Sequence, residues 1–308
     1  MKTNYLILNL SLFSSLFSYT TQASDLEDLV EQEKNDAHWS GLPVWGEEVK
    51  AMGYELPIPI GFGVYMNSQD VEYVAMDDFK IDAIGGLLGG RNGSHYVVPA
   101  EDVTITGQDK SIQLRADAWV LPFLNVYTLA GYTQGTKSIK ADLSNATKDG
   151  NPFPVPATIP INLEYDAYNI GLGGVLATQF EVSKNINPII FTLAGAITKS
   201  KTTATDSIIK TRIGSVRVGQ RYDVPYGKLA VLAGYQYQNI EQNVSGSIAD
   251  LGKLADKLDF DVDLKSKEVH NMSIAMVYDF GYQKEWNIMA EYGFLNWTQF
   301  MISAGYRF

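Results

Sequence analysis

The chain has 308 residues, of which 45% are hydrophobic and only 19% are charged, and its formal net charge is −11. This composition is typical of a folded chain rather than a disordered one, and the acidic balance excludes a basic footprint for nucleic acid. The absence of cysteine excludes disulfides, thiolate zinc ligands and a thiol nucleophile. With three histidines in the whole chain, a multi-histidine metal site is not expected, and no cofactor is indicated.

The first residues have the layout of a secretory signal peptide. Lys2 supplies a short positive region, residues 5–17 are mostly apolar, and Thr21-Gln22-Ala23 fits a small-residue cleavage site. The apolar stretch is shorter than the roughly 20 residues of a membrane-spanning helix. No later stretch of about 18 apolar residues follows, so no helical membrane span is predicted. We therefore expect residues 1–23 to be a signal peptide.

Residues 24–56 are predicted to form a periplasmic N-terminal segment. Residues 24–30 resemble a capped, acidic helix start, and Trp39 and Trp45 flank a Gly-Leu-Pro turn at 41–43. We expect this segment to lie against or in the mouth of the domain that follows.

From residue 57 onward the hydrophobic period becomes two, which indicates strands with one apolar face. The last strand is the clearest case, because apolar and aromatic side chains there alternate with small or polar ones. Strands with an apolar outer face and a small or polar inner face are typical of a transmembrane β-barrel. The predicted strands are 58–67, 110–120, 124–135, 161–176, 187–199, 206–221, 227–240, 264–280, 285–294 and 297–308.

These strands predict an all-β fold, a transmembrane antiparallel β-barrel of about 10 strands, with 8–12 allowed, spanning residues 57–308. The connections 68–109, 136–160 and 241–263 are long, whereas several of the alternate connections are short. Since such barrels have short periplasmic turns and long outer loops, both termini are expected in the periplasm. Short helical pieces are expected in the N-terminal segment and in one outer loop.

Two local patterns sharpen this prediction. The apolar face of 206–221 changes phase, which predicts a bulge near Gly214. In the loop 241–263 the apolar residues are spaced by three and four, which predicts a short helix. That helical face comprises Ile248, Leu251, Leu254, Ala255 and Leu258.

The chain ends in an alternating pattern with a terminal aromatic residue. Its positions are Phe300, Ile302, Ala304, Tyr306 and Phe308. This pattern resembles the C-terminal assembly signal of Gram-negative outer-membrane proteins. The resemblance implies insertion by the barrel-assembly machinery and a location in the outer membrane, in contact with its lipid and lipopolysaccharide.

Several charged residues are predicted to face the lumen, because charge facing lipid would be unfavourable. They could line an anion-selective path for a small solute, or they could pair across a narrow lumen and brace it. Since about eight strands enclose an interior just filled by side chains, bracing is favoured. The residues are Arg115, Asp117, Lys210, Arg212, Arg217, Glu291 and Arg307.

Catalytic and metal sites are weighed as alternatives. His270 and Ser273 fall on opposite faces of a regular strand, and His95 follows Ser94 with no orienting acid evident. An omptin-like arrangement of acids and histidine is not matched, so no catalytic residues are assigned. The residues Asp259, Asp261 and Asp263 could form a calcium site, but a solvated strand face is favoured.

The sequence therefore predicts an outer-membrane barrel that is not an enzyme. Its expected role is a narrow or gated porin-like conduit or a ligand-binding protein of the cell surface. A barrel hydrolase acting on lipid or peptide, and an adhesin or structural surface protein, stay as alternatives.

Overall fold

The computed structural model of the protein describes residues 41–51, 56–154, 156–183, 185–203, 207–250, 252–253 and 255–308. The predicted signal peptide, the helix start at 24–30 and Trp39 lie outside these residues. In the described ranges, none of the helices is both long and apolar enough to span a membrane.

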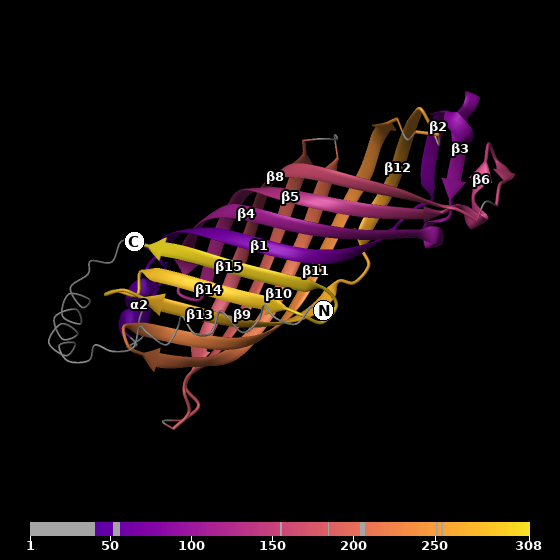
Figure 1. Cartoon of the computed structure of the whole chain (residues 1–308). Helices are drawn as coiled ribbons and strands as arrows, with labels where there is room; N and C mark the ends of the chain where they lie inside the picture. Colours follow the sequence, from indigo (N-terminus) through magenta and orange to yellow (C-terminus); the bar gives the residue numbers. More distant parts are fainter. Residues whose placement is uncertain are drawn as a thin grey trace. The chain divides into compact units, whose positions relative to one another are not determined.

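Ten antiparallel strands form a closed ring (Figure 1), as the sequence predicts. Each strand pairs with its neighbours, and the ring closes where β10 pairs with β11 and β1 pairs with β15. In chain order the ring strands are β1 (Ile60–Ala75), β4 (Val103–Leu121), β5 (Leu124–Asp142), β8 (Thr158–Phe180), β9 (Ile189–Thr202), β10 (Ile208–Val224), β11 (Gly227–Ala249), β13 (His270–Phe280), β14 (Trp286–Gly293) and β15 (Thr298–Arg307).

The remaining elements are short. Helix α2 (Gly46–Ala51) precedes the first strand, and helix α3 (Gly86–Gly89) and two 3-10 turns, η1 (Ala100–Asp102) and η2 (Leu143–Asn145), lie between strands. The additional strands are β2 (Phe79–Gly85), β3 (Gly90–Val98), β6 (Thr147–Lys148), β7 (Asn151–Pro152) and β12 (Lys257–Ser266).

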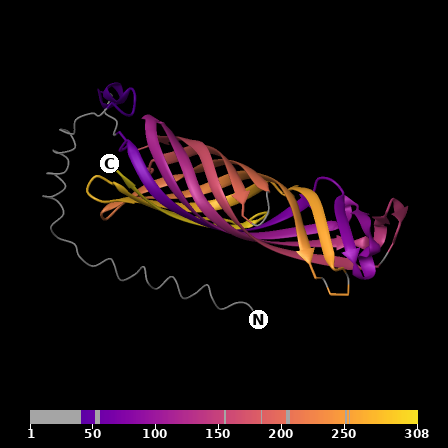
Figure 2. The ribbon, with the colours of Figure 1, turned by 90° about the horizontal axis from the view of Figure 1, so that it is seen from above.

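These additional strands continue the sheet beyond the ring. Strand β12 pairs with β11 on one side and with β1 and β2 on the other, and β3 joins β2 to β6. We call this part the extension: β2, β3, β6, β7 and β12 together with the adjoining ends of β1, β4, β5, β8, β10 and β11. It lies at the end of the barrel away from the C-terminus, as Figures 1 and 2 show.

The other end of the barrel holds both chain termini of the ring. The N–H of Phe308 donates to the carbonyl of Ile60 at 3.0 Å, which joins the last strand to the start of the first. The N–H of Val44, just before α2, donates to the carbonyl of Val120 at 2.8 Å. The described part of the N-terminal segment therefore contacts the β4–β5 turn at this end, which we call the terminal end.

Apolar side chains cover the outer surface of the ring as a continuous belt. Every strand of the ring contributes, for example Met66, Leu114, Val126, Leu172, Leu193, Val218, Val231, Ile274, Ile288 and Ile302. Such a large exposed apolar surface is unfavourable in water but matches the hydrocarbon of a bilayer. The ring is therefore a membrane-spanning β-barrel, and its even strand number and alternation agree with this class.

The extension has the opposite polarity, which β4 shows within one strand. In the belt Leu114 points outward with 63% exposure, and its neighbour Arg115 points inward. Ten residues earlier Thr104 is exposed, while Val103 and Ile105 are buried. The parity of the strand does not change between these points, so the apolar side moves from the outer face to the inner one.

The inward apolar side chains of the extension form its own hydrophobic core. They come from both walls of the sheet, and the largest fully buried ones are Phe79, Ile81, Tyr96, Ile105, Ile139, Leu143, Ile161, Leu258 and Leu264. Burial of this kind is the main stabilising contribution to a water-soluble β domain. The extension therefore folds as a soluble structure on top of the membrane barrel.

The long connections thus differ from the expected loops. The helix predicted over 248–258 is wrong, because Ile248 and Leu258 are direct partners in the β11–β12 ladder. Their spacing also satisfies a strand in which apolar and polar residues alternate, and core burial selects that alternative. Leu251 and Leu254 lie outside the described residues. The predicted strand 264–280 is divided between β12 and β13.

The bulge predicted near Gly214 is also absent, since β10 keeps an unbroken register with β9 and β11 through this point. The change of phase has another cause. Ile209 is buried in the core of the extension, whereas Val218 faces the membrane. The strand crosses from one polarity to the other without slipping.

Candidate functional site

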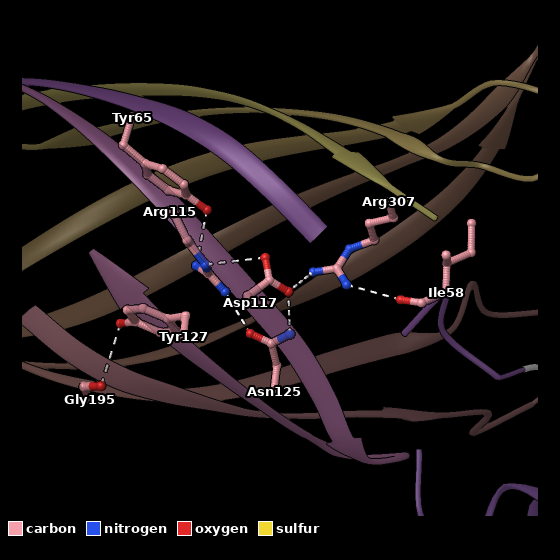
Figure 3. A network of polar contacts seen from close by, with 8 residues as sticks. All are labelled: Ile58, Tyr65, Arg115, Asp117, Asn125, Tyr127, Gly195 and Arg307. Atoms are coloured by element: carbon pink, nitrogen blue, oxygen red, sulfur yellow. Dashed lines mark hydrogen bonds and ion pairs between the residues drawn. The ribbon is translucent and has the colours of Figure 1, made fainter. Parts of the chain in front are cut away.

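A network of charged and polar side chains fills the interior near the terminal end (Figure 3). Asp117 accepts from Arg307, at 2.5 Å, and from the Nδ2 of Asn125, also at 2.5 Å. Arg115 donates to the Oδ1 of Asn125 at 2.7 Å, and its Nε lies 3.5 Å from Asp117. Arg307 also donates to the carbonyl of Ile58 at 3.1 Å. These contacts tie β15 to β4 and β5.

Two aromatic residues hold Arg115 in place within this network. The guanidinium donates to the hydroxyl of Tyr65 at 3.0 Å and lies 3.9 Å from the ring centre of Tyr127. Figure 3 shows the two tyrosines on opposite sides of the arginine. Cation–π contact of this kind stabilises a desolvated cation. Arg115 is therefore fixed and not a free lining charge.

A second network is centred on Glu291, which is 2% exposed. Arg217 forms two parallel hydrogen bonds to it, of 3.0 and 2.7 Å, and Gln236 and Ser273 each donate to its Oε1. Strands β10 and β14 are separated in the ring by β11 and β13. The ion pair therefore crosses the interior of the barrel.

Further toward the extension, amide side chains also cross the interior. The Nε2 of Gln238 on β11 donates to Gln69 on β1 at 3.2 Å, although β13, β14 and β15 separate these strands in the ring. Nearby, Asn271 donates to the carbonyl of Trp297, which is buried at the β14–β15 turn. Gln238, Gln69, Asn271 and Trp297 therefore occupy the interior at this level.

A buried lysine marks the boundary with the core of the extension. Lys137 is 2% exposed, donates to the hydroxyl of Tyr165 at 3.2 Å, and lies 4.7 Å from the ring centre of Tyr73. The hydroxyl of Tyr165 donates to Asp109 at 2.5 Å. Burial lowers the pKa of Lys137 to about 8, although the charge of Asp109 opposes this shift. We call Lys137, Tyr73, Tyr165 and Asp109 the Lys137 cluster.

The structure brings together five of the seven charged residues predicted to face the lumen. Arg115, Asp117 and Arg307 share one network, and Arg217 and Glu291 share the other. In both networks the charges pair with one another, as the bracing interpretation expects.

The inward assignment of Lys210 and Arg212 is wrong. Both side chains are exposed on the outer face of β10, and Arg212 pairs with Glu241 at 3.2 Å with 60% of its side chain exposed. Their neighbour Ile209 takes the inward position because it belongs to the core of the extension. The assignment assumed one polarity along the whole strand.

Sequence reasoning missed the uncharged and distant partners. Asn125 is almost fully buried, and in the sequence it stands between the apolar residues Leu124 and Val126. It lies two residues from Tyr127 and so shares its strand face, which could have placed it inside the barrel. Lys137 follows the inward Gly131 by six residues and so shares its face. Extending that parity into the loop 136–160 would have revealed it.

The serine and histidine pairs do not form hydrolytic sites. His270 stacks on Tyr235 at the outer surface, whereas Ser273 donates to Glu291 inside the barrel. His95 has an acid partner that the sequence did not suggest, since its Nδ1 lies 2.7 Å from Asp82. However, Ser94 is its direct neighbour in β3 and therefore points to the other face.

The three alternating aspartates lie on the polar face of β12. Asp259 pairs with Lys257 at 2.6 Å, and Asn243 donates to both Asp261 and Asp263 at 2.9 Å. Within the described ranges, no group of three histidine, aspartate or glutamate side chains is arranged to hold a metal ion. This arrangement is that of a solvated strand face.

The residues of the predicted assembly signal lie on the outer face of β15 and at Phe308 directly after it. Phe300, Ile302, Tyr306 and Phe308 are all exposed there. Phe308 stacks on Phe62 of the first strand at 5.9 Å. Strand β15, which carries the predicted signal, therefore also forms the seam that closes the ring.

No protein-family model matches the chain, and no curated protein matches it. Among solved structures, the transport unit of the autotransporter AIDA-I from Escherichia coli is 8% identical and covers 92% of this chain and 96% of its own, with a TM-score of 0.36. The translocator domain of NalP from Neisseria meningitidis is 10% identical and covers 93% of this chain and 98% of its own, with a TM-score of 0.34.

A third neighbour is the Ralstonia pickettii toluene transporter TbuX, which is 11% identical and covers 82% of this chain and 90% of its own, with a TM-score of 0.30. These likenesses concern the barrel fold. No ligand or activity is carried over from them to this chain.

Proposed function

We propose that the protein is a non-enzymatic outer-membrane barrel that presents the extension at the cell surface for ligand recognition. The observation that carries this proposal is the folded core of the extension, placed directly above the barrel interior. A porin-like conduit needs a continuous water path through the barrel. Here the same strands continue into a domain with its own apolar core.

The interior contacts support a closed barrel over a conduit. A solute entering from the terminal end would meet the Asp117 network, then the Arg217–Glu291 pair, and then the Lys137 cluster. Beyond these lies the core of the extension, which excludes water. Arg115 and Arg217 are each held by several hydrogen bonds, so a passing solute would have to displace charges that are already paired.

The orientation is part of the proposal. With the extension outside the cell, the termini of the ring and the β4–β5 turn lie in the periplasm, after export directed by residues 1–23 and with 24–56 as a periplasmic segment. The outward aromatic and apolar residues of β15 then serve the barrel-assembly machinery as its signal. The apolar belt contacts outer-membrane lipid and lipopolysaccharide.

The absence of cysteine makes the orientation directly testable. Thr106→Cys places one thiol on the exposed face of the extension, and Gln283→Cys places one in the exposed β13–β14 turn at the terminal end. A membrane-impermeant maleimide applied to intact cells should label the first variant and not the second. Labelling of Gln283→Cys alone would overturn the proposed orientation.

The closed interior is tested by planar-bilayer recording of the purified full chain. We expect no conductance steps over many insertions, with a known porin as the positive control. Regular steps that change ion preference in an Arg217→Glu variant would establish a conduit and contradict the proposal.

A further inference from the structure

Three cations gather on the outer wall of the barrel where the membrane belt ends. Lys199 on β9 and Lys210 and Arg212 on β10 are exposed on the outer face. We call these three residues the basic patch. Lys199 and Lys210 are directly opposite each other in the β9–β10 register. Like charges placed opposite each other in antiparallel strands are destabilising.

One carboxylate partly balances the basic patch. Glu241 on β11 is 3.2 Å from Arg212 and is the register partner of Lys210. Three cations against this one carboxylate still leave a surplus of positive charge, in a chain whose net charge is −11. An anion at this place would relieve the repulsion between the two lysines.

The level of the basic patch matches lipid headgroups. On β9 the next outward residues toward the terminal end are Ile197, Gly195 and Leu193, and both large side chains are exposed. On β10 the exposed Val218 lies on the same side. The patch therefore stands at the upper edge of the apolar belt.

A shallow, open groove of about 520 Å³ lies in the apolar wall beside the basic patch. It reaches the patch itself, because Arg212 forms part of its lining. The lining residues are Leu172, Gly173, Gly195, Ala196, Ile197, Arg212 and Ile213. The shallow groove thus joins an apolar surface at membrane depth to the cation of Arg212.

Gly195, which lines this groove, belongs to a row of outward-facing glycines. Gly174, Gly195 and Gly214 are partners in register across β8, β9 and β10. A Cβ at Gly195 would meet nothing closer than 3.8 Å, whereas a Cβ at the inward Gly173 would lie 2.3 Å from the ring of Tyr127. The inward glycine is required by packing, but the outward row is not, and glycine weakens a strand.

We propose that this wall binds one molecule of a phosphorylated, acylated glycolipid of lipid A chemistry. A phosphate of the lipid lies on the basic patch, and one acyl chain lies in the groove beside it. The inference rests on the proposed function, because such a glycolipid belongs to the outer leaflet, on the side of the extension. The positive charge of the basic patch favours a phosphate group as its ligand. The position of the groove within the apolar belt favours a lipid over a protein partner.

Native mass spectrometry of the purified full chain tests this proposal. The protein is incubated in detergent micelles with bisphosphorylated lipid A, with its dephosphorylated form, or with phosphatidylglycerol. We expect one lipid A to be retained, with the dephosphorylated form and phosphatidylglycerol retained far less. The double variant Lys199→Glu with Lys210→Glu should lower lipid A retention by roughly tenfold or more, because two charges of the site are reversed.

Matched variants separate the site from general effects. Lys110→Glu with Lys140→Glu reverses two exposed charges on β4 and β5 and should leave retention unchanged. Gly195→Leu should lower lipid A retention because the new side chain fills the groove. Ala130→Leu, which adds the same side chain to the outer face of β5, should leave retention unchanged. Heat-dependent electrophoretic mobility checks that every variant is folded.

Equal lipid A retention by the wild type and the Lys199→Glu, Lys210→Glu variant would overturn the proposal. Retention of phosphatidylglycerol as strong as that of lipid A would also overturn it. This measurement does not depend on orientation in the cell. If the maleimide labelling contradicts the proposed orientation but lipid A is retained, only the proposed function fails. If the labelling agrees but lipid A is not retained, only this inference fails.

Discussion

Removal of the Glu291 carboxylate should destabilise the barrel strongly, because four donors would lose their acceptor. Arg217 supplies two of these hydrogen bonds, and Gln236 and Ser273 supply the others. Glu291→Ala would leave the Arg217 guanidinium, whose side chain is 15% exposed, unpaired inside the barrel. We expect a loss of about 3–5 kcal/mol in the free energy of unfolding.

The double variant Arg217→Met with Glu291→Leu provides the control. Replacing a buried ion pair by apolar residues of similar size is often neutral, so the double variant should be more stable than Glu291→Ala. The assay is urea unfolding of protein folded into lipid vesicles, followed by tryptophan fluorescence. A loss below about 1 kcal/mol in Glu291→Ala, or strictly additive effects of the two substitutions, would refute the bracing role of this pair.

Three other predictions concern the extension. Burial lowers the pKa of Lys137 from 10.5 to about 8, so between these values the unfolded chain binds more protons than the folded chain. The free energy of unfolding should therefore rise with pH from about 8 to 9.5. Urea unfolding of Lys137→Met should not show this rise. Ile81→Ala should cost about 2–5 kcal/mol and make the extension sensitive to protease while the barrel stays resistant. Millimolar calcium should change the thermal unfolding temperature of neither the wild type nor Asp261→Asn. A calcium-dependent stabilisation of the wild type that is lost in the variant would contradict the interpretation of these aspartates as a solvated strand face.

Much of the barrel could be predicted from the sequence because the membrane imposes a simple rule on it. Alternation such as that of Phe300, Ile302 and Tyr306 follows directly from one face in lipid and one face inside. All ten predicted ring strands have counterparts in the structure. At the terminal end, several neighbouring strands are joined by short turns, so their pairing follows from their order in the sequence.

The extension could not be predicted by that rule because its apolar side chains face inward and its polar side chains face outward. Ile105 and Ile139 are buried where the barrel rule demands polar residues. The same reversal misplaced Lys210 and Arg212, and it gave the apolar residues around Ile248 a helical spacing by coincidence. A polarity change along a single strand is visible in β4 once both halves are compared.

The interior partners were beyond sequence reasoning for a different reason. Arg217 and Glu291 are 74 positions apart, and only the ring order brings β10 within two intervening strands of β14. Parity can place a residue inside the barrel. It cannot choose its partner across the interior.

Amide hydrogen exchange of the protein in nanodiscs tests the folded extension most directly. The amides of β2 and β12, and those of Ile105 and Ile139, should exchange slowly, with protection comparable to that of the ring strands. Exchange of these amides at the rate of unstructured loops would show that no folded domain covers the barrel, and it would contradict the account.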